Sequence, residues 1–280
     1  MQRMRKNTAL GAAQLIGLLA VMAGCGGGYG GETTLQNPPP NPGSQNVGIN
    51  GRYNLVLTSA NGQAPKTINV YTDFVQTEGT LEAAATTLIC PSNNVSQCVD
   101  VSIAPTGTVN GANVTIVISF QDPAGADTVT LVGTGQGKSL TGTYSDTLGR
   151  SGTWTASTAV LPFPSPPNPY DYTGTFNSTS DPLPIPPKIS LALALDSPTN
   201  LAGSATIMNW PCAASLTLEG QALGDAFTVT DAANKVRLIA LPTPPNSGGF
   251  TFNYKFEPAA PSCAGNFGLG DLSVINVWDY

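Results

Sequence analysis

The sequence has no histidine and little charge of either sign. Among its 280 residues, Asp, Glu, Lys and Arg together make up 10%, well below the quarter that is typical of soluble domains. Without imidazole, Ser-His-Asp and Cys-His catalysis are excluded, and the commonest zinc ligand and general base are missing. The chain also has no P-loop, no G-x-G-x-x-G motif opening a helix and no EF-hand loop. These absences predict a protein that is not an enzyme and that uses no cofactor or metal.

The first 24 residues have the three-part layout of a secretory signal. The chain opens with three basic residues, Arg3, Arg5 and Lys6. The apolar run that follows, Thr8–Met22, is about fifteen residues long and too short for a bilayer span of roughly 20. The segment Val21–Cys25 reads Val-Met-Ala-Gly-Cys and resembles the lipobox of bacterial lipoproteins, with Met where Leu is commoner. The resemblance implies cleavage before Cys25 and lipid on its sulfur.

Cys25 also accounts for an odd cysteine count. Five cysteines in an exported chain leave one unpaired thiol, and lipidation of Cys25 removes it from the count. The alternative is an ordinary secreted protein in which Cys25 is a plain cysteine. The lipoprotein resemblance implies a diacylglyceryl anchor, which is stable because it carries two chains. Gly26, rather than Asp, follows the cysteine, which in such proteins goes with the outer membrane of Gram-negative bacteria. The expected partner is therefore the lipid bilayer, bound through Cys25.

The rest of the chain is acidic. With three of the 11 basic residues in the signal, 8 remain against 17 acidic residues, a formal net charge of −9. Phosphate binding needs clustered Lys and Arg, and no such cluster is present. No nucleic-acid partner is expected, and the protein or glycan partner is left open.

Two proline-rich stretches divide the chain. Residues 25–50 are rich in Gly and Pro and nearly free of apolar side chains, which predicts a tether. Residues 161–171 contain five prolines, which exclude a helix or a central strand. The predicted organisation is a signal at 1–24, the lipidated tether, a first domain at 51–160, a linker, and a second domain at 172–280.

Both predicted domains have strand patterns. Val114–Phe120 is rich in β-branched residues and follows the turn signal Asn110-Gly111. Asp127–Val132 and Ile189–Leu195 alternate in the manner of half-buried strands. Gly133–Lys138 resembles a phosphate loop only superficially, because it joins two strands, and is predicted to be a hairpin turn. The only helix candidate, Leu81–Leu88, is short. The fold class predicted is all-β, with two tandem small antiparallel β-barrels or β-sandwiches.

The two halves resemble copies of each other. Gly-x-aromatic sequences open both, and Gly-x-aromatic sequences recur near both ends. This predicts that Tyr53 matches Phe176 and Trp154 matches Phe267, with the residues beyond Phe267 forming an extra or displaced strand. The opening Gly-x-aromatic, the Leu-x-Gly-x-aromatic hairpins and the closing Gly-x-Trp resemble the plan of calycins, the group that includes avidins and lipocalins, and also small β domains of envelope lipoproteins. That resemblance implies barrels, but it transfers no ligand residue.

Four cysteines remain after lipidation. Pairing within domains, Cys90–Cys98 and Cys212–Cys263, is the simplest of three connectivities. Structural disulfides suit an exported protein. A redox pair is the alternative, although the chain has no C-x-x-C motif.

Carboxylates are the remaining candidates for chemistry. Asp73, Glu78 and Glu82 lie close in sequence and could serve glycoside hydrolysis, while Asp122 and Asp127 flank a turn that could bind Ca²⁺. In each case the competing interpretation is a solvated turn or strand end. Six aromatic residues are expected to close the β cores: Tyr53, Tyr144, Trp154, Phe176, Tyr254 and Phe267. The sequence thus predicts a membrane-anchored envelope lipoprotein with a non-enzymatic binding or structural role. A carboxylate-dependent glycan hydrolase and a calycin-like small-ligand carrier are the alternatives.

Overall fold

The computed structural model describes residues 45–276 apart from 61, 85, 102, 123–124, 161–162, 164–168, 179–184, 211–213, 244–250 and 259–267, with the backbone alone at 122, 176–178, 258 and 274–276. The first half contains β1 (Gly51–Ser59), β2 (Thr67–Thr77), β3 (Thr80–Ala83), β4 (Leu88–Pro91), the 3₁₀ turn η1 (Val95–Gln97), β5 (Val99–Asp100), β6 (Thr106–Asn110), β7 (Asn113–Asp122), β8 (Gly125–Gln136), β9 (Ser139–Asp146) and β10 (Ser151–Thr158). The second half contains β11 (Tyr170–Ser178), β12 (Lys188–Leu195), β13 (Asn200–Met208), β14 (Ser215–Leu223), β15 (Ala226–Asp231), β16 (Val236–Pro242), β17 (Thr251–Pro258) and β18 (Gly268–Asn276).

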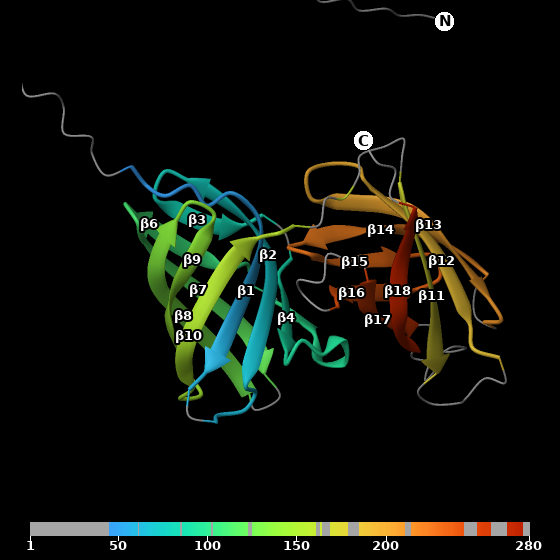
Figure 1. Ribbon diagram of the computed structural model, residues 1–280, viewed down its shortest axis with the longest axis horizontal. Coiled ribbons are helices and arrows are strands. Elements are labelled where there is room, and N and C mark those ends of the chain that lie inside the picture. The colour runs from blue at the N-terminus through green and yellow to red at the C-terminus, as the bar shows by residue number, and fades with distance from the viewer. Residues whose placement is uncertain are drawn as a thin grey trace, which may run out of the picture. The chain divides into compact units, whose positions relative to one another are not determined.

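The first half is a closed antiparallel barrel. Its strands pair in the order β1-β10-β9-β8-β7-β6-β3-β2, and β2 pairs back with β1. The short strands β4 and β5 form a branch outside this ring, because β4 pairs with the part of β2 that β3 leaves free. Figure 1 shows these strands in blue to yellow-green. Closure leaves the eight strands of the ring without a free edge.

The second half is a closed barrel of eight strands, β11 to β18, each paired with the next and β18 with β11 (Figure 1). All pairs are antiparallel. The prediction of two tandem all-β domains is therefore confirmed. Of the two architectures expected, both domains adopt the barrel and not the sandwich.

The strand patterns produce this fold through side-chain alternation. Val129 and Leu131 of β8 are buried while their neighbours Thr128 and Thr130 lie on the outer face. The predicted turns at Gly111 and Gly137 join β6 to β7 and β8 to β9, and both glycines have positive φ. Gly133–Lys138 is the end of β8 and its hairpin turn, as expected.

The helix considered at Leu81–Leu88 is not formed. β3 ends at Ala83 and β4 starts at Leu88. Leu81 is buried in the first barrel while Glu82 is exposed, an alternation of period two that fits a strand. Pairing with β2 therefore decides the local structure against the helix propensity of the alanines.

Aromatic and aliphatic side chains fill the interior of the first barrel. Trp154 and Tyr53 are buried with the aliphatic residues of the facing strands. Gly133 and Gly142 pair across β8 and β9 beneath the Trp154 indole. A Cβ at either glycine would collide with a backbone carbonyl and with the indole. These two glycines make room for the largest side chain of the core.

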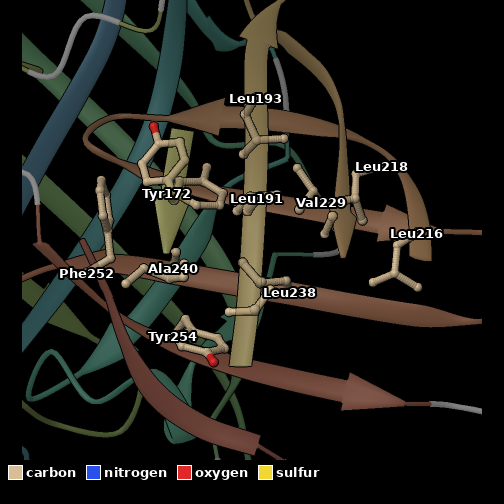
Figure 2. Packing of buried hydrophobic residues seen from close by; sticks show 14 of the residues in the cluster. Tyr172, Leu191, Leu193, Leu216, Leu218, Val229, Leu238, Ala240, Phe252 and Tyr254 are labelled. Atoms are coloured by element: carbon tan, nitrogen blue, oxygen red, sulfur yellow. The ribbon is translucent and has the colours of Figure 1, made fainter. Parts of the chain in front are cut away.

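The interior of the second barrel is filled in the same way. Figure 2 shows leucines of β12 and β14 together with side chains of β16 and β17, all of which belong to one buried cluster. Phe163, which precedes β11, packs edge-on against Phe227 at a centroid distance of 5.9 Å. In the first barrel, Val47 and Ile49 precede β1 and pack on its core. In both barrels, a segment ahead of the first strand thus adds apolar side chains to the core.

The shared strand order agrees with the predicted duplication, but the residue that corresponds to Tyr53 differs from the one expected, and the match of Trp154 with Phe267 stays a prediction. Tyr53 and Tyr172 are each the third residue of the first strand, and both are buried. Phe176 lies near the end of β11, and its side chain and Phe267 are outside the described part. The described residues beyond Phe267 form β18, which is the eighth strand that closes the barrel rather than an extra or displaced one.

No helix among the described residues is long and apolar enough to span a membrane.

Candidate functional site

The two barrels share a third apolar cluster that lies outside both interiors. The cluster combines outer-face residues of the first barrel and of its β4–β5 branch with residues from β14, β15 and β16. Its members are Tyr71, Leu88, Cys90, Val95, Cys98, Leu223, Ala226, Ile239 and Leu241, with Leu269 at its margin. As a result β2 and β16 bury residues on both faces. The described residues of both barrels belong to one compact unit.

Hydrogen bonds at the β14–β15 turn join the barrels. Asn54 Nδ2 donates to Asp225 Oδ2 at 2.5 Å, and Asn54 Oδ1 accepts from the Asp225 amide at 2.8 Å. The other oxygen of Asp225 accepts from the Val160 amide at 2.7 Å. Gly224 has positive φ and lies against Asn54, so that a Cβ there would collide with Asn54 Oδ1 and with the Tyr53 carbonyl. The turn is therefore fitted to the outer face of β1.

Half-buried Arg52 and buried Asp73 place charge beside this turn. An Arg52 Nη donates to the Gly224 carbonyl at 3.1 Å, and the guanidinium lies 5.2 Å from the centre of the Phe163 ring. Burial lowers the pKa of Arg52, although the charges of Asp225 and Asp73 oppose this. Burial likewise raises the pKa of Asp73, partly offset by Arg52. Each of these two charges offsets part of the other's desolvation cost at the interface.

The predicted disulfide Cys90–Cys98 is formed, and it lies in the shared cluster. It closes the loop that contains η1, in which Asn94 Oδ1 accepts from the Ser96 amide at 3.0 Å. Tyr71 Oη donates to Asn93 Oδ1 at 2.6 Å and fixes the loop against β2. Cys25, Cys212 and Cys263 lie outside the described residues, so lipidation and the second pairing stay predictions.

Three grooves lie around this interface. One, of about 590 Å³, is polar and is lined by Thr86 and Asp100 of the first barrel and by Asp196, Glu219 and Arg237 of the second. Arg237 crosses it to Asp100 with a 2.6 Å ion pair. The Thr86 amide also donates across it to Gln221 Oε1 at 3.2 Å.

The other two grooves have the disulfide-closed loop as a common wall. The larger, of about 1050 Å³, runs from Pro65 and Leu148 at the end of the first barrel past the loop to Lys255 of β17. The smaller, of about 470 Å³, lies between the loop and Asn253, Tyr254 and Asp271. Ser92 and Ser96 line both. Each of the three grooves has walls from both barrels and lies outside the two interiors.

The structure does not bring the first predicted carboxylate group together. Asp73 is buried at the interface beside Arg52, whereas Glu78 lies in the β2–β3 turn and Glu82 on β3, both exposed. The Glu82 side chain points to the solvent on a strand whose Leu81 points inward. Asp73 is therefore a buried charge at the interface, whereas Glu78 and Glu82 are solvated.

Asp127 is engaged by protein partners. One oxygen accepts from Arg150 Nη2 at 2.6 Å, and the other accepts from Thr147 Oγ1 at 2.8 Å. Asp146 binds the Nε of the same guanidinium at 2.5 Å. Arg150 and Thr147 thereby occupy both oxygens of Asp127, one of the two carboxylates expected to bind Ca²⁺. The side chain of Asp122 is outside the described part.

Sequence reasoning placed Tyr53, Tyr144, Trp154 and Tyr254 in the cores, and all four are buried there. It missed Asn54 and Asp225, because a contact between residues 171 positions apart leaves no local pattern. A signal was available in the run Val236–Leu241, whose consecutive apolar residues Leu-Ile-Ala-Leu fit a strand buried on both faces.

Among the described residues no cluster of three or more Cys, Asp or Glu side chains is arranged to hold a metal ion. No protein-family model matches this chain, and no curated protein is significantly similar to it.

Proposed function

We propose that this protein is an exported lipoprotein with a non-enzymatic binding role, whose partner is bound on the outside, in the grooves where the two barrels meet. The observation that carries the location is that both interiors are filled by side chains while grooves of about 590, 1050 and 470 Å³ surround the interface. Ligand sites in proteins are concave and commonly lie between domains.

The anchoring part of the proposal rests on Val21–Cys25. Replacing Cys25 with Ser removes the sulfur that would carry lipid, so the variant should move from the membrane fraction to the soluble fraction. Gly28→Ala, three residues away, should remain with the membranes. If Cys25→Ser still sediments with membranes and the wild-type mass shows no lipid, the anchor is refuted.

The external location of the binding site is tested with an apolar probe. A fluorescent fatty acid should show no saturable binding inside the second barrel, because buried apolar side chains fill that interior (Figure 2). Saturable binding that is weakened by Leu193→Phe but not by Leu148→Arg would place the site inside the barrel, as in a carrier, and contradict the proposal.

A glycan hydrolase is the second candidate, favoured by one observation. Asp196 and Glu219 line the same polar groove, and two positioned carboxyl groups suffice for glycoside hydrolysis. Release of reducing sugar from peptidoglycan or a β-glucan, abolished in Glu219→Gln and in Asp196→Asn, would establish this candidate. Release that persists in both variants, or none at all, would reject it.

A further inference from the structure

The loop closed by Cys90 and Cys98 lies where the two barrels meet, and we propose that its disulfide is a redox-sensitive clasp. While the bond is closed, the loop holds the outer faces of the barrels together. When the bond is reduced, those faces separate without either barrel unfolding. The proposal goes beyond ligand binding and does not depend on the lipid anchor.

The burial of the loop supports the clasp. Cys90 is 0% exposed, Val95 7% and Cys98 9%. All three belong to the cluster that contains Ile239 and Leu241 of β16. The loop residues themselves therefore form part of the surface on which the second barrel packs.

Besides the disulfide, two hydrogen bonds to β2 hold the loop, from the Ser92 amide to the Thr67 carbonyl at 2.8 Å and from Tyr71 Oη to Asn93 Oδ1 at 2.6 Å. Its other hydrogen bonds are short-range bonds of the loop itself. Within it, the Gln97 amide donates to the Asn94 carbonyl at 2.9 Å and the Cys98 amide to the Val95 carbonyl at 3.3 Å. These are single-turn hydrogen bonds, which are marginal by themselves because forming an isolated turn is unfavourable. A covalent link between the two ends limits the conformations of the open loop, which is how disulfides stabilise. The bonds to β2 hold the first half of the loop, whereas the docked position of Val95, in its second half, depends on the disulfide.

The topology explains why the barrels should survive opening. The ring β1-β10-β9-β8-β7-β6-β3-β2 is closed by direct pairing of β2 with β1. The strands that carry the disulfide loop, β4 and β5, branch from β2 outside that ring. Loosening the branch breaks no pair of the ring.

Opening would also remove a wall from two grooves. Ser92 and Ser96 of the loop line both the groove of about 1050 Å³ and that of about 470 Å³. Lys255 faces the loop in the first, and Asp271 faces it in the second. The redox state of one bond would thus decide whether both grooves exist.

The chemistry is ordinary thiol–disulfide exchange. A dithiol reductant passes two electrons and two protons to the Cys90–Cys98 bond. The sulfur–sulfur bond breaks, two thiols form, and the reductant becomes a disulfide. Cys90 is fully buried, but Cys98 lines the groove of about 1050 Å³, so the reductant approaches the bond from the Cys98 side.

The test is hydroxyl-radical footprinting of the full chain, oxidised, treated with dithiothreitol, and as the double variant Cys90→Ala/Cys98→Ala. The expected result is at least a threefold rise in the modification of Tyr71 and Ile239 in the last two samples. Trp154 and Phe252, inside the two barrels, should keep their oxidised-state rates. Unchanged Tyr71 and Ile239 would overturn the proposal. A joint rise of Trp154 and Phe252 would also overturn it, because the bond would then maintain the barrel folds.

A second variant leaves the cysteines intact. Val95→Asp places a charge in the shared cluster and should expose Tyr71 and Ile239 and speed reduction of the disulfide by about tenfold. Val132→Asp, at a position 53% exposed on the outer face of β8, is the matched control and should change neither measurement. Equal behaviour of the two variants would overturn the clasp.

Discussion

At the residue scale, Gly133 and Gly142 decide whether Trp154 can pack in the core of the first barrel. The Gly142 position lies under the Trp154 indole, whose Nε1 donates to the Val132 carbonyl at 3.2 Å. A side chain there must displace either the indole or the backbone of β8. Glycine is required at this position by the close approach of these groups rather than by a special backbone angle.

Gly142→Ala should therefore destabilise the protein by about 2–3 kcal/mol, the usual cost of overpacking a core. Urea unfolding measures it. Gly48→Ala is the control, because a Cβ at Gly48 would contact nothing within 4 Å, and its midpoint should stay close to that of the wild type. Equal stability of Gly142→Ala and wild type would contradict the packing described for Trp154.

Two tyrosine hydroxyls should have opposite effects on stability. Tyr172 is 0% exposed, and its hydroxyl has no hydrogen-bond partner among the described residues. Tyr144 is also buried, but its hydroxyl pairs with Ser59 Oγ at 2.8 Å. Both lie in filled barrel cores, so each substitution to Phe removes one oxygen and leaves the ring.

Tyr172→Phe should raise the free energy of unfolding by up to about 1 kcal/mol, because a buried hydroxyl without a partner carries a desolvation cost. Tyr144→Phe should lower it by about 1 kcal/mol through loss of a hydrogen bond. Chemical denaturation of both variants checks the pair. Destabilisation by both to the same extent would show that the Tyr172 hydroxyl has an unrecognised partner.

At the scale of the element, two aspartates at strand positions should respond to pH in opposite ways. Asp231 ends β15, where burial disfavours its charge. Hydrogen bonds from Asn234 and from the amides of Thr217 and Ala233 outweigh burial and hold the pKa of Asp231 below its usual 3.8. On β2, burial raises the pKa of Asp73 despite Arg52.

The signs follow from linkage. A carboxylate whose pKa is lowered by folding stabilises the protein above its unfolded-state pKa, and this stability is lost as the pH falls through its folded-state pKa. Asp231→Asn should therefore cost more stability at pH 7 than at pH 3. A raised pKa gives stability that is lost as the pH rises through the folded value, so Asp73→Asn should be relatively more stable at pH 7 than at pH 3. Denaturant unfolding of both variants at the two pH values checks this. The same sign for both would refute the assigned causes.

The elements also show how far the sequence could be read. Alternation and turn residues predicted the strands at Val114–Phe120, Asp127–Val132 and Ile189–Leu195, because each is buried on one face of a barrel. The division into two domains predicted the Cys90–Cys98 pair, because pairing within domains is the simplest of the three connectivities. The helix considered at Leu81–Leu88 was wrong. Its alanines favour a helix, but pairing with other strands of the chain makes β3 and β4 extended.

Apart from the apolar run of β16, the interface left no local pattern in the sequence. Asn54 and Asp225 are polar residues of an ordinary strand and an ordinary turn until the fold places them together. Tyr71 and Leu223 would be read as single outward apolar residues, which need no explanation in a monomer. The sequence therefore predicted two barrels but not that they share an apolar cluster.

At the scale of the whole molecule, the chain is organised around the contact between its barrels. An apolar cluster, the Asn54–Asp225 pair, the Asp100–Arg237 ion pair and the disulfide-closed loop all lie there. The three grooves are formed by the same contact. Binding in these grooves requires that the barrels behave as one body.

A double-mutant cycle between Asn54 and Asp225 tests this most directly, because it measures coupling between residues of different barrels. The free energy of unfolding is measured for the wild type, Asn54→Ala, Asp225→Ala and the double variant. The two hydrogen bonds between these residues predict a coupling energy of at least about 1 kcal/mol. If the loss of stability in the double variant equals the sum of the two single losses to within about 0.3 kcal/mol, the barrels do not meet at this turn. That result would contradict the placement of the binding site between them.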